Sequence, residues 1–127
     1  MTAQAMNHFT ILAEDLRETC SFYGDLLGLT EGYWPHMGFP GAWLYAGDQA
    51  VLHVVVRSLP QPRAGVIDHM AFSASGLAET VHKLESKGVR YQLGRQVETG
   101  VWQLFFHDPN GARVELDFVA TEEEPAR

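Results

Sequence analysis

The sequence contains a single cysteine, Cys20, among its 127 residues. A lone cysteine excludes an internal disulfide and makes the cytoplasm the default compartment. Cys20 lies in an apolar stretch with helical spacing, which favours a core residue over a nucleophile. The chain has no apolar run near the roughly 18 residues of a membrane span. Its first six residues also lack the basic start and apolar segment of a signal peptide. We therefore expect a cytoplasmic protein.

Positive charge is also scarce, with 9 Lys and Arg against 16 Asp and Glu and a formal net charge of -7. The basic residues form no stripe, which argues against nucleic acids and anionic membranes as partners. Part of the negative charge lies in the C-terminal segment 120–127, which we expect to be a solvated tail. The remaining composition, 46% hydrophobic and 20% charged, is that of one globular domain spanning 1–127.

One sequence pattern occurs twice along the chain. An offset of 61 residues places His8 on His69 and Leu16 on Leu77. After one inserted residue, an offset of 62 places His53 on Glu115. The repeat therefore brings three histidines and one glutamate to corresponding positions, which predicts a shared metal site on a pseudo-twofold axis.

The expected elements follow the same order in both copies. Asp15 to Glu18 reads as a capping box and Gly28 as a helix stop. The first copy should contain strands at 7–13, 30–34, 42–46 and 50–57, with a helix after the first strand; the second should contain strands at 66–74, 89–93, 101–107 and 112–119, with a helix at 77–87. This order predicts an α+β fold of two βαβββ modules, about 7–58 and 66–119, joined by a linker at 59–65.

The chemistry of the repeated residues fits a transition metal. Imidazole nitrogens and a carboxylate oxygen favour such ions, and two histidines with one carboxylate leave positions open for substrate. His8, His69 and Glu115 supply this set, and His53 is a candidate fourth ligand. Any one of these residues alone is better interpreted as a surface or core histidine or a solvated glutamate. Their matching offsets favour the shared site.

Aromatic residues cluster in the middle of the first copy, where they could form core or line a pocket. A loop with several glycines and prolines could present some of them to a ligand. The substrate-binding candidates are Trp34, His36, Phe39 and Trp43, with Gln103 as a weaker candidate for the opposite wall. His107 precedes a turn and could face either side of its strand.

These motifs resemble the vicinal oxygen chelate superfamily, which includes glyoxalase I, fosfomycin-resistance proteins, methylmalonyl-CoA epimerase and extradiol dioxygenases. The motifs that carry the resemblance are His8, the run Phe22-Tyr23-Gly24-Asp25-Leu26-Leu27-Gly28-Leu29, Asp68-His69-Met70-Ala71-Phe72, and Phe106-His107-Asp108-Pro109-Asn110-Gly111 followed by Glu115. The resemblance implies paired βαβββ modules that form a cupped mixed sheet with helices outside. It also implies a divalent metal that a substrate chelates through adjacent oxygens, and a homodimer.

Departures from the member patterns limit the choice of reaction. Glyoxalase I resembles the chain but carries glutamate at the position of His53, and epimerases carry glutamine there. The acid–base pair typical of extradiol dioxygenases and the cation loop of fosfomycin-type transferases have no counterpart here. Bleomycin-binding members lack the metal ligands that this chain has.

We therefore expect a metal-dependent enzyme acting on a small oxygen-rich molecule, with a glyoxalase-like lyase or isomerase favoured. Glu115 would bind metal and shuttle a proton, while His53 would act as a ligand or a base. The metal could be iron, nickel, cobalt, zinc or manganese. The alternatives are an Fe(II) dioxygenase and a non-catalytic binding protein of the resistance type.

Overall fold

The computed structural model describes residues 1–61, 63 and 65–126. The chain divides into two compact units, Met1–Pro60 and Gln61–Arg127. Their boundary falls within the predicted linker 59–65, of which residues 62 and 64 lie outside the described residues. That the two units pack as one domain stays a prediction. In the described part of the chain, no helix has the length and apolar character needed to cross a membrane.

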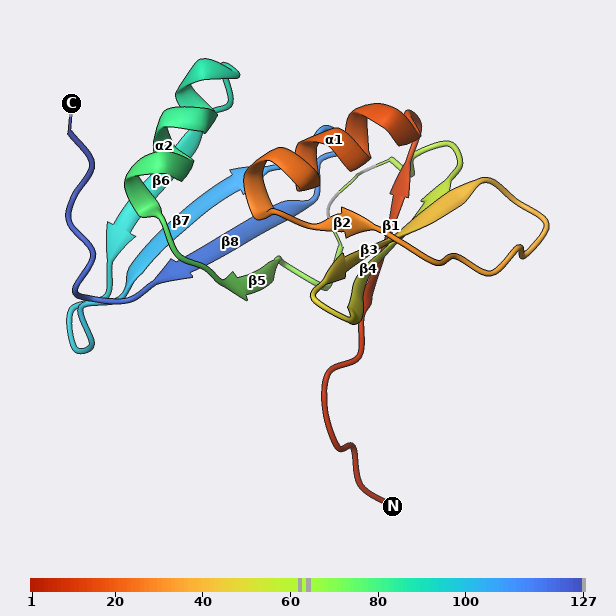
Figure 1. The fold of residues 1–127 in the computed structure, drawn as a ribbon, viewed down its shortest axis with the longest axis horizontal. Helices are drawn as coiled ribbons and strands as arrows, with labels where there is room; N and C mark the ends of the chain where they lie inside the picture. Colours follow the sequence, from red (N-terminus) through yellow and green to blue (C-terminus); the bar gives the residue numbers. More distant parts are fainter. Residues whose placement is uncertain (62, 64, 127) are drawn as a thin grey trace. The chain divides into compact units, whose positions relative to one another are not determined.

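The first unit is a βαβββ module (Figure 1). Its elements are β1 (Phe9–Ala13), α1 (Leu16–Leu27), β2 (Thr30–Glu31), β3 (Gly41–Ala46) and β4 (Gln49–Val56). The strands form a sheet in the order β1-β4-β3-β2. β1 and β4 pair in parallel, whereas β3 pairs antiparallel with both β4 and β2. A parallel pair needs a long crossover connection, and here that connection contains α1, β2 and β3.

The second unit repeats this topology. Its elements are β5 (Met70–Ser73), α2 (Leu77–Ser86), β6 (Tyr91–Arg95), β7 (Trp102–His107) and β8 (Arg113–Phe118). The order is β5-β8-β7-β6, again with one parallel pair between the first and last strands. The predicted α+β fold of two βαβββ modules is confirmed, with one four-stranded mixed sheet in each module.

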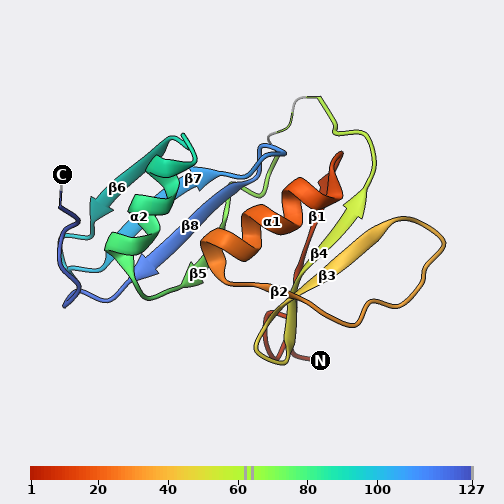
Figure 2. The ribbon, with the colours of Figure 1, turned by 45° about the horizontal axis from the view of Figure 1, so that its top comes forward.

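Each sheet of the repeat has an apolar face and a mixed face. In β7, the buried residues Trp102, Leu104 and Phe106 alternate with the more accessible Gln103 and Phe105. Figures 1 and 2 both show α2 lying across this sheet. The apolar side chains of α2 that are buried, such as Leu77 and Leu84, complete the core of the unit. The opposite face carries polar residues together with Phe105 and is free to carry a site.

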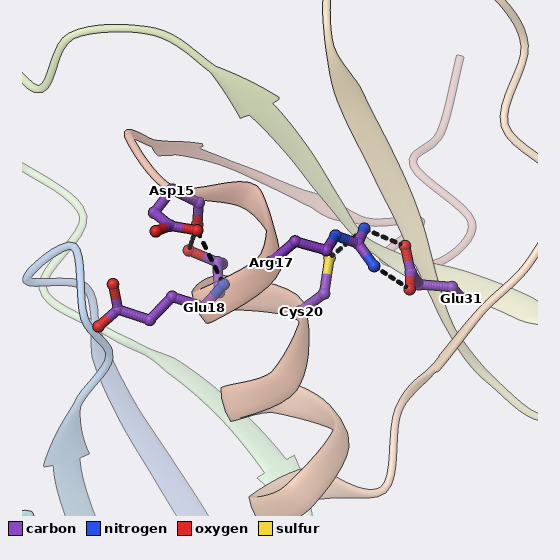
Figure 3. A network of polar contacts seen from close by, with 6 residues as sticks. Asp15, Arg17, Glu18, Cys20 and Glu31 are labelled. Carbon is purple, nitrogen blue, oxygen red and sulfur yellow. Dashed lines mark hydrogen bonds and ion pairs between the residues drawn. The ribbon is translucent and has the colours of Figure 1, made fainter.

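Helix α1 begins as the sequence predicts. The Asp15 carboxylate accepts the backbone N–H of Glu18 at 3.0 Å, and Gly28 ends the helix in the left-handed conformation. Figure 3 shows the Glu18 carboxylate extended away from Asp15 rather than folded back towards it. One half of the predicted capping box is therefore present at this helix start.

Cys20 belongs to the core side of α1, as predicted, and is 7% exposed. Burial, together with the nearby negative charge of Glu31, raises the pKa of the Cys20 thiol to about 11. Figure 3 shows the Arg17 guanidinium between Cys20 and Glu31, with Arg17–Glu31 contacts of 2.6 and 2.9 Å. This ion pair lowers the pKa of Glu31 and ties β2 to α1. A thiol with this pKa is protonated at neutral pH and is a poor nucleophile.

Two predicted strands are shorter than expected. The strand expected at 66–74 begins only at Met70, because Met70 is the first residue with a partner on β8, Val114. Val66 and Ile67 are exposed. The strand expected at 30–34 is reduced to β2, and residues 32–40 form a loop. His69 therefore lies at the entrance to β5, where its side chain is less constrained by the pleat.

The prediction that segment 120–127 is a solvated tail is wrong for its first residues. The Glu122 carboxylate accepts the backbone N–H groups of Gly76 and Leu77, at 3.2 and 2.7 Å, and so caps the start of α2. Trp102 donates its indole N–H to the Glu122 carbonyl at 2.8 Å. A negative charge at a helix N-terminus is stabilising, which explains why an acidic residue ends up docked there.

Replacing this cap should destabilise the protein. We expect Glu122→Ala to lower the free energy of unfolding by about 1 kcal/mol, the usual cost of losing a helix cap. Glu123→Ala is the matched control, because Glu123 is exposed in the same segment and has the same charge. Urea unfolding of both variants at low salt measures the effect. Equal midpoints for the two variants would contradict the capping role.

Candidate metal centre

His69 has a different partner on each ring nitrogen. Its Nδ1 lies 2.7 Å from Asp68 Oδ2, and its Nε2 lies 3.0 Å from Glu115 Oε1. Because a carboxylate at neutral pH only accepts hydrogen bonds, the Nδ1 carries the hydrogen that Asp68 accepts. The Nε2 is then the nitrogen available to a metal. A carboxylate behind a metal-binding imidazole is a common arrangement, since it fixes the tautomer and the ring orientation.

The spacing between His69 Nε2 and Glu115 Oε1 fits two ligands of one ion. A neutral imidazole with hydrogen on Nδ1 presents a lone pair at Nε2, and the facing carboxylate oxygen also has only lone pairs. A proton or a cation between them makes the contact favourable. Ligand bonds of about 2.1 Å at angles of about 90 to 110° place neighbouring donor atoms about 3.0 to 3.4 Å apart. The observed 3.0 Å falls within this range.

Glu115 is held in place from the neighbouring strand. It lies on the inner strand β8, opposite Ala71 of β5 and Phe105 of β7, and is 6% exposed. Gln103 of β7 donates from Nε2 to Glu115 Oε2 at 3.3 Å, so the two carboxylate oxygens have different partners. Gln103, predicted as a substrate contact, thus touches the carboxylate directly.

Asp117 is a residue of this centre that the sequence reasoning left without a role. Burial, a hydrogen bond to Glu115 and the charge of Glu115 raise the pKa of Asp117 from 3.8 to about 6. Its Oδ1 is buried and has no hydrogen-bond partner among the described residues. Two carboxylates this close share a proton readily, because ionising both is unfavourable. Asp117 is therefore a candidate site for holding a proton beside Glu115.

Removing the Asp117 carboxyl should change the pH dependence of stability. As pH rises from about 4 to about 6, the unfolded chain loses this proton before the folded chain does, so the residue's stabilising contribution is lost over that window. Between pH of about 4 and about 6, the free energy of unfolding of Asp117→Asn should rise relative to that of wild type. At higher pH, the difference between the two proteins should stay constant. Urea unfolding of the metal-free proteins at pH 4.5, 5.5, 6.5 and 7.5 measures this. A difference that does not vary with pH would contradict the assignment.

The first unit carries a related arrangement around His8. The His8 Nδ1 lies 2.7 Å from the Asn7 side-chain oxygen, just as His69 Nδ1 lies 2.7 Å from Asp68. Asn7 and Asp68 are also related by the offset of 61 residues. Both copies thus place an oxygen-bearing side chain before the histidine, which orients the ring with Nε2 free of that contact.

His53 lies between two parallel rings. Its ring centroid is 3.7 Å from that of His8 and 4.0 Å from that of Trp43, with interplanar angles of 12° and 11°. Register explains the Trp43 contact, because Trp43 of β3 is directly opposite His53 of β4. Burial, followed by the charge of His8, lowers the pKa of His53. His53 is therefore neutral at neutral pH and able to accept a proton.

The other predicted pocket residues lie on or near the loop 32–40. Trp43 is half-buried and stacks on His53. The Tyr33 ring lies edge-on to the Trp43 ring, with 6.4 Å between the ring centroids. The ring centroids of Trp34 and His36 are 5.1 Å apart. Trp34 is half-buried and His36 is exposed. Phe39 is half-buried on the same loop. Trp43 is the aromatic candidate placed beside His53, a predicted metal ligand.

Each unit contributes part of the predicted ligand set. His8 and His53 meet in the first unit, and His69 and Glu115 meet in the second. Among the residues that the structure describes, no three His, Cys, Asp or Glu side chains lie close enough together to hold a metal ion.

Comparison of the sequence with known proteins identifies a family. The model of the Glyoxalase/Bleomycin resistance protein/Dioxygenase superfamily matches residues 5–116. The chain is 31% identical over 121 residues to Glyoxylase I 4 of Arabidopsis thaliana, covering 88% of this chain and 69% of that protein. It is 30% identical over 118 residues to the glutathione transferase FosA of Serratia marcescens, covering 89% and 79%.

Solved structures show the same fold. The crystal structure of a glyoxalase family protein from Bacillus anthracis aligns with a TM-score of 0.74 and 24% identity, covering 94% of this chain and 98% of that one. At this level of identity the likeness concerns the fold, with its paired βαβββ modules.

Proposed function

Because the chain belongs to the Glyoxalase/Bleomycin resistance protein/Dioxygenase superfamily, we propose that it is a divalent-metal-dependent enzyme acting on a small oxygen-rich molecule. The observation that carries the proposal is the pairing of His69 Nε2 with Glu115 Oε1 at 3.0 Å, with Asp68 behind the ring. A glyoxalase-like lyase or isomerase is the favoured reaction class, supported by the 31% identity to Glyoxylase I 4.

His8, His69 and Glu115 are the proposed metal ligands. Two imidazole nitrogens and one carboxylate oxygen suit iron, nickel, cobalt, zinc or manganese and leave positions open for a chelating substrate. When bound, such a metal acts as a Lewis acid towards two adjacent substrate oxygens. Asn7 and Asp68 orient the two rings, and Gln103 orients the carboxylate.

His53 is better suited to proton transfer than to binding the same ion as His8. A ligand nitrogen points its lone pair at the metal in the plane of its ring. The His8 and His53 planes are 12° from parallel and their centroids are 3.7 Å apart, so their lone pairs do not converge on one point. The lowered pKa of His53 keeps this imidazole unprotonated and available as a base.

Glu115 and Asp117 provide a second place for a proton. The raised pKa of Asp117 allows its carboxyl to share a proton with Glu115 in the metal-free chain. An isomerase must take a proton from one substrate carbon and return it to a neighbouring atom. His53 and the Glu115–Asp117 pair are the groups of this chain that could do so.

The walls of the substrate pocket are assigned to the first unit. Trp43 flanks His53, and Trp34, His36 and Phe39 lie on the loop before β3. Aromatic side chains exclude water and bury the apolar part of a small substrate. The ligands of one site would come either from both units of one chain or from two chains of a homodimer.

A second candidate function is transfer of a thiol to a small electrophile. The observation that favours it is the 30% identity to the glutathione transferase FosA over 89% of this chain. In such a step the thiolate sulfur forms a bond to carbon, the carbon–oxygen bond of an epoxide breaks, and the resulting alkoxide takes up the thiol proton.

One panel of assays separates these functions. The metal-free protein is reconstituted with nickel, zinc, manganese or Fe(II), and each form is given the hemithioacetal of methylglyoxal and glutathione, glutathione with a small epoxide, or catechol under oxygen. We expect metal-dependent isomerisation of the hemithioacetal that is lost in His53→Asn and retained in His82→Asn, a control on the exposed face of α2. Metal-dependent turnover of the epoxide alone would favour the transferase. Absence of turnover with every metal would overturn the enzyme assignment.

A further inference from the structure

The second unit contains a cavity whose charge differs from that of the chain as a whole. Its volume is about 490 Å³, and its lining includes Arg90, Gln92, Phe105, His107 and Arg113. The described residues that line it include two guanidinium groups and one imidazole, and no carboxylate. In a chain with a formal net charge of -7, such a lining stands out.

Arg113 is fixed in position within this lining. Its Nη1 lies 2.8 Å from Asp68 Oδ2, and its Cζ lies 4.3 Å from the centre of the Phe105 ring. Asp68 is mostly exposed, with 74% of its side chain accessible, so it screens this charge only partly. A guanidinium has five N–H donors, so the contact with Asp68 leaves others available to a ligand. A positioned guanidinium loses little freedom when it binds an anion.

The sheet register places this cavity beside the proposed metal ligands. His107 of β7 lies opposite Arg113 of β8, and Gln92 of β6 lies opposite Phe105. Arg113 and Glu115 are two residues apart on one strand, so they share a face at a separation of roughly 7 Å. Asp68 also contacts both Arg113 and His69. The cationic lining and the Glu115–His69 pair therefore lie next to each other on the second unit, with Phe105 between them.

We propose that this cavity binds the anionic group, a carboxylate or a phosphate, of the substrate. Arginine forks match both groups, because each presents two oxygens to parallel N–H donors. The part of this inference that joins the anion to a metal-chelated substrate rests on the proposed function. It narrows the substrate to a small molecule that carries an anionic group in addition to its chelating oxygens.

The test is an NMR titration of the full chain with inorganic phosphate and, separately, with propionate, at constant ionic strength and pH 7.5. The variants are Arg90→Gln and Arg113→Gln, and the matched control is Arg57→Gln, an exposed arginine of the first unit with the same charge change. Arg90→Gln is needed because Arg113→Gln also removes a contact of Asp68. We expect at least one probe to bind and each cavity variant to weaken it about tenfold, as loss of a charge-assisted hydrogen bond should.

The outcomes separate this inference from the proposed function. The inference is supported if both cavity variants weaken binding, Arg57→Gln does not, and the same holds in the metal-free protein. A preference for propionate or phosphate identifies the anionic group. Failure of both probes to bind, or equal weakening in all three variants, overturns the inference even if the protein binds metal and turns over. If the chain binds a probe but retains no metal after reconstitution, the proposed function is overturned and the inference about the cavity stands.

Discussion

Glu115→Gln is expected to lower the affinity for a divalent metal by at least about 100-fold, because losing even an outer-shell partner of a ligand costs about 10- to 100-fold. Glutamine keeps the shape of the side chain and a contact with Gln103, but it removes the anionic oxygen that faces His69 Nε2 at 3.0 Å. Turnover should fall with metal affinity. Competition titration against a chromophoric chelator measures the affinity.

The same variant should not unfold the protein. Glu115 is buried next to Asp117, whose pKa it raises, so removing its charge relieves repulsion in the metal-free chain. The urea midpoint should therefore stay the same or rise at pH 7.5. Glu98→Gln, at an exposed turn position, is the charge-matched control. Wild-type metal affinity in Glu115→Gln would show that the site is assigned to the wrong residue.

Gly41→Ala is expected to lower the free energy of unfolding by about 3 kcal/mol, at the upper end of the cost of overpacking. A Cβ atom at this position would lie 2.4 Å from the backbone oxygen of Val54 on the neighbouring strand. Because neither the new Cβ atom nor the backbone oxygen can rotate away, β3 must move away from β4. That shift would separate Trp43 from His53, so affinity for an aromatic-contacting substrate should also fall.

Gly94→Ala is the matched control for this substitution. Gly94 also lies in a strand, β6, but a Cβ there meets no atom within 4 Å. Its stability should be unchanged or rise by less than about 1 kcal/mol, since alanine restricts the unfolded chain. Urea unfolding of both variants tests the contrast. Equal stability of Gly41→Ala and Gly94→Ala would contradict the close approach of β3 and β4.

Much of the fold could be predicted because short-range sequence patterns mark the helices and strands of the repeat. The Asp15 cap, the Gly28 stop and the alternation in 101–107 are short-range patterns, and each appears at the expected place. The offsets of 61 and 62 also aligned His53 with Glu115, and each lies on an inner strand of its sheet. Matching positions in a repeat predict matching positions in the fold.

The features that the sequence did not reveal depend on contacts distant in sequence, on burial or on side-chain orientation. Glu122 caps a helix that begins 45 residues earlier, at Leu77, which no local pattern can show. The raised pKa of Asp117 follows from burial and from its neighbour Glu115. Asn7 and Asp68 were visible in the repeat, since both precede a predicted ligand by one residue, but their role depends on ring orientation. The cationic lining around Arg90 and His107 arises from three strands brought together by register.

The central claim is that His8 and His69, together with Glu115, hold one divalent metal. The most direct test is elemental analysis of the purified, reconstituted chain and of the double variant His8→Ala, His69→Ala, with His82→Ala, His107→Ala as a control that also removes two histidines. The account predicts about one metal per chain in wild type and control, and none in the double variant. Metal retained in the double variant, or absent from wild type after reconstitution with each candidate ion, would contradict it.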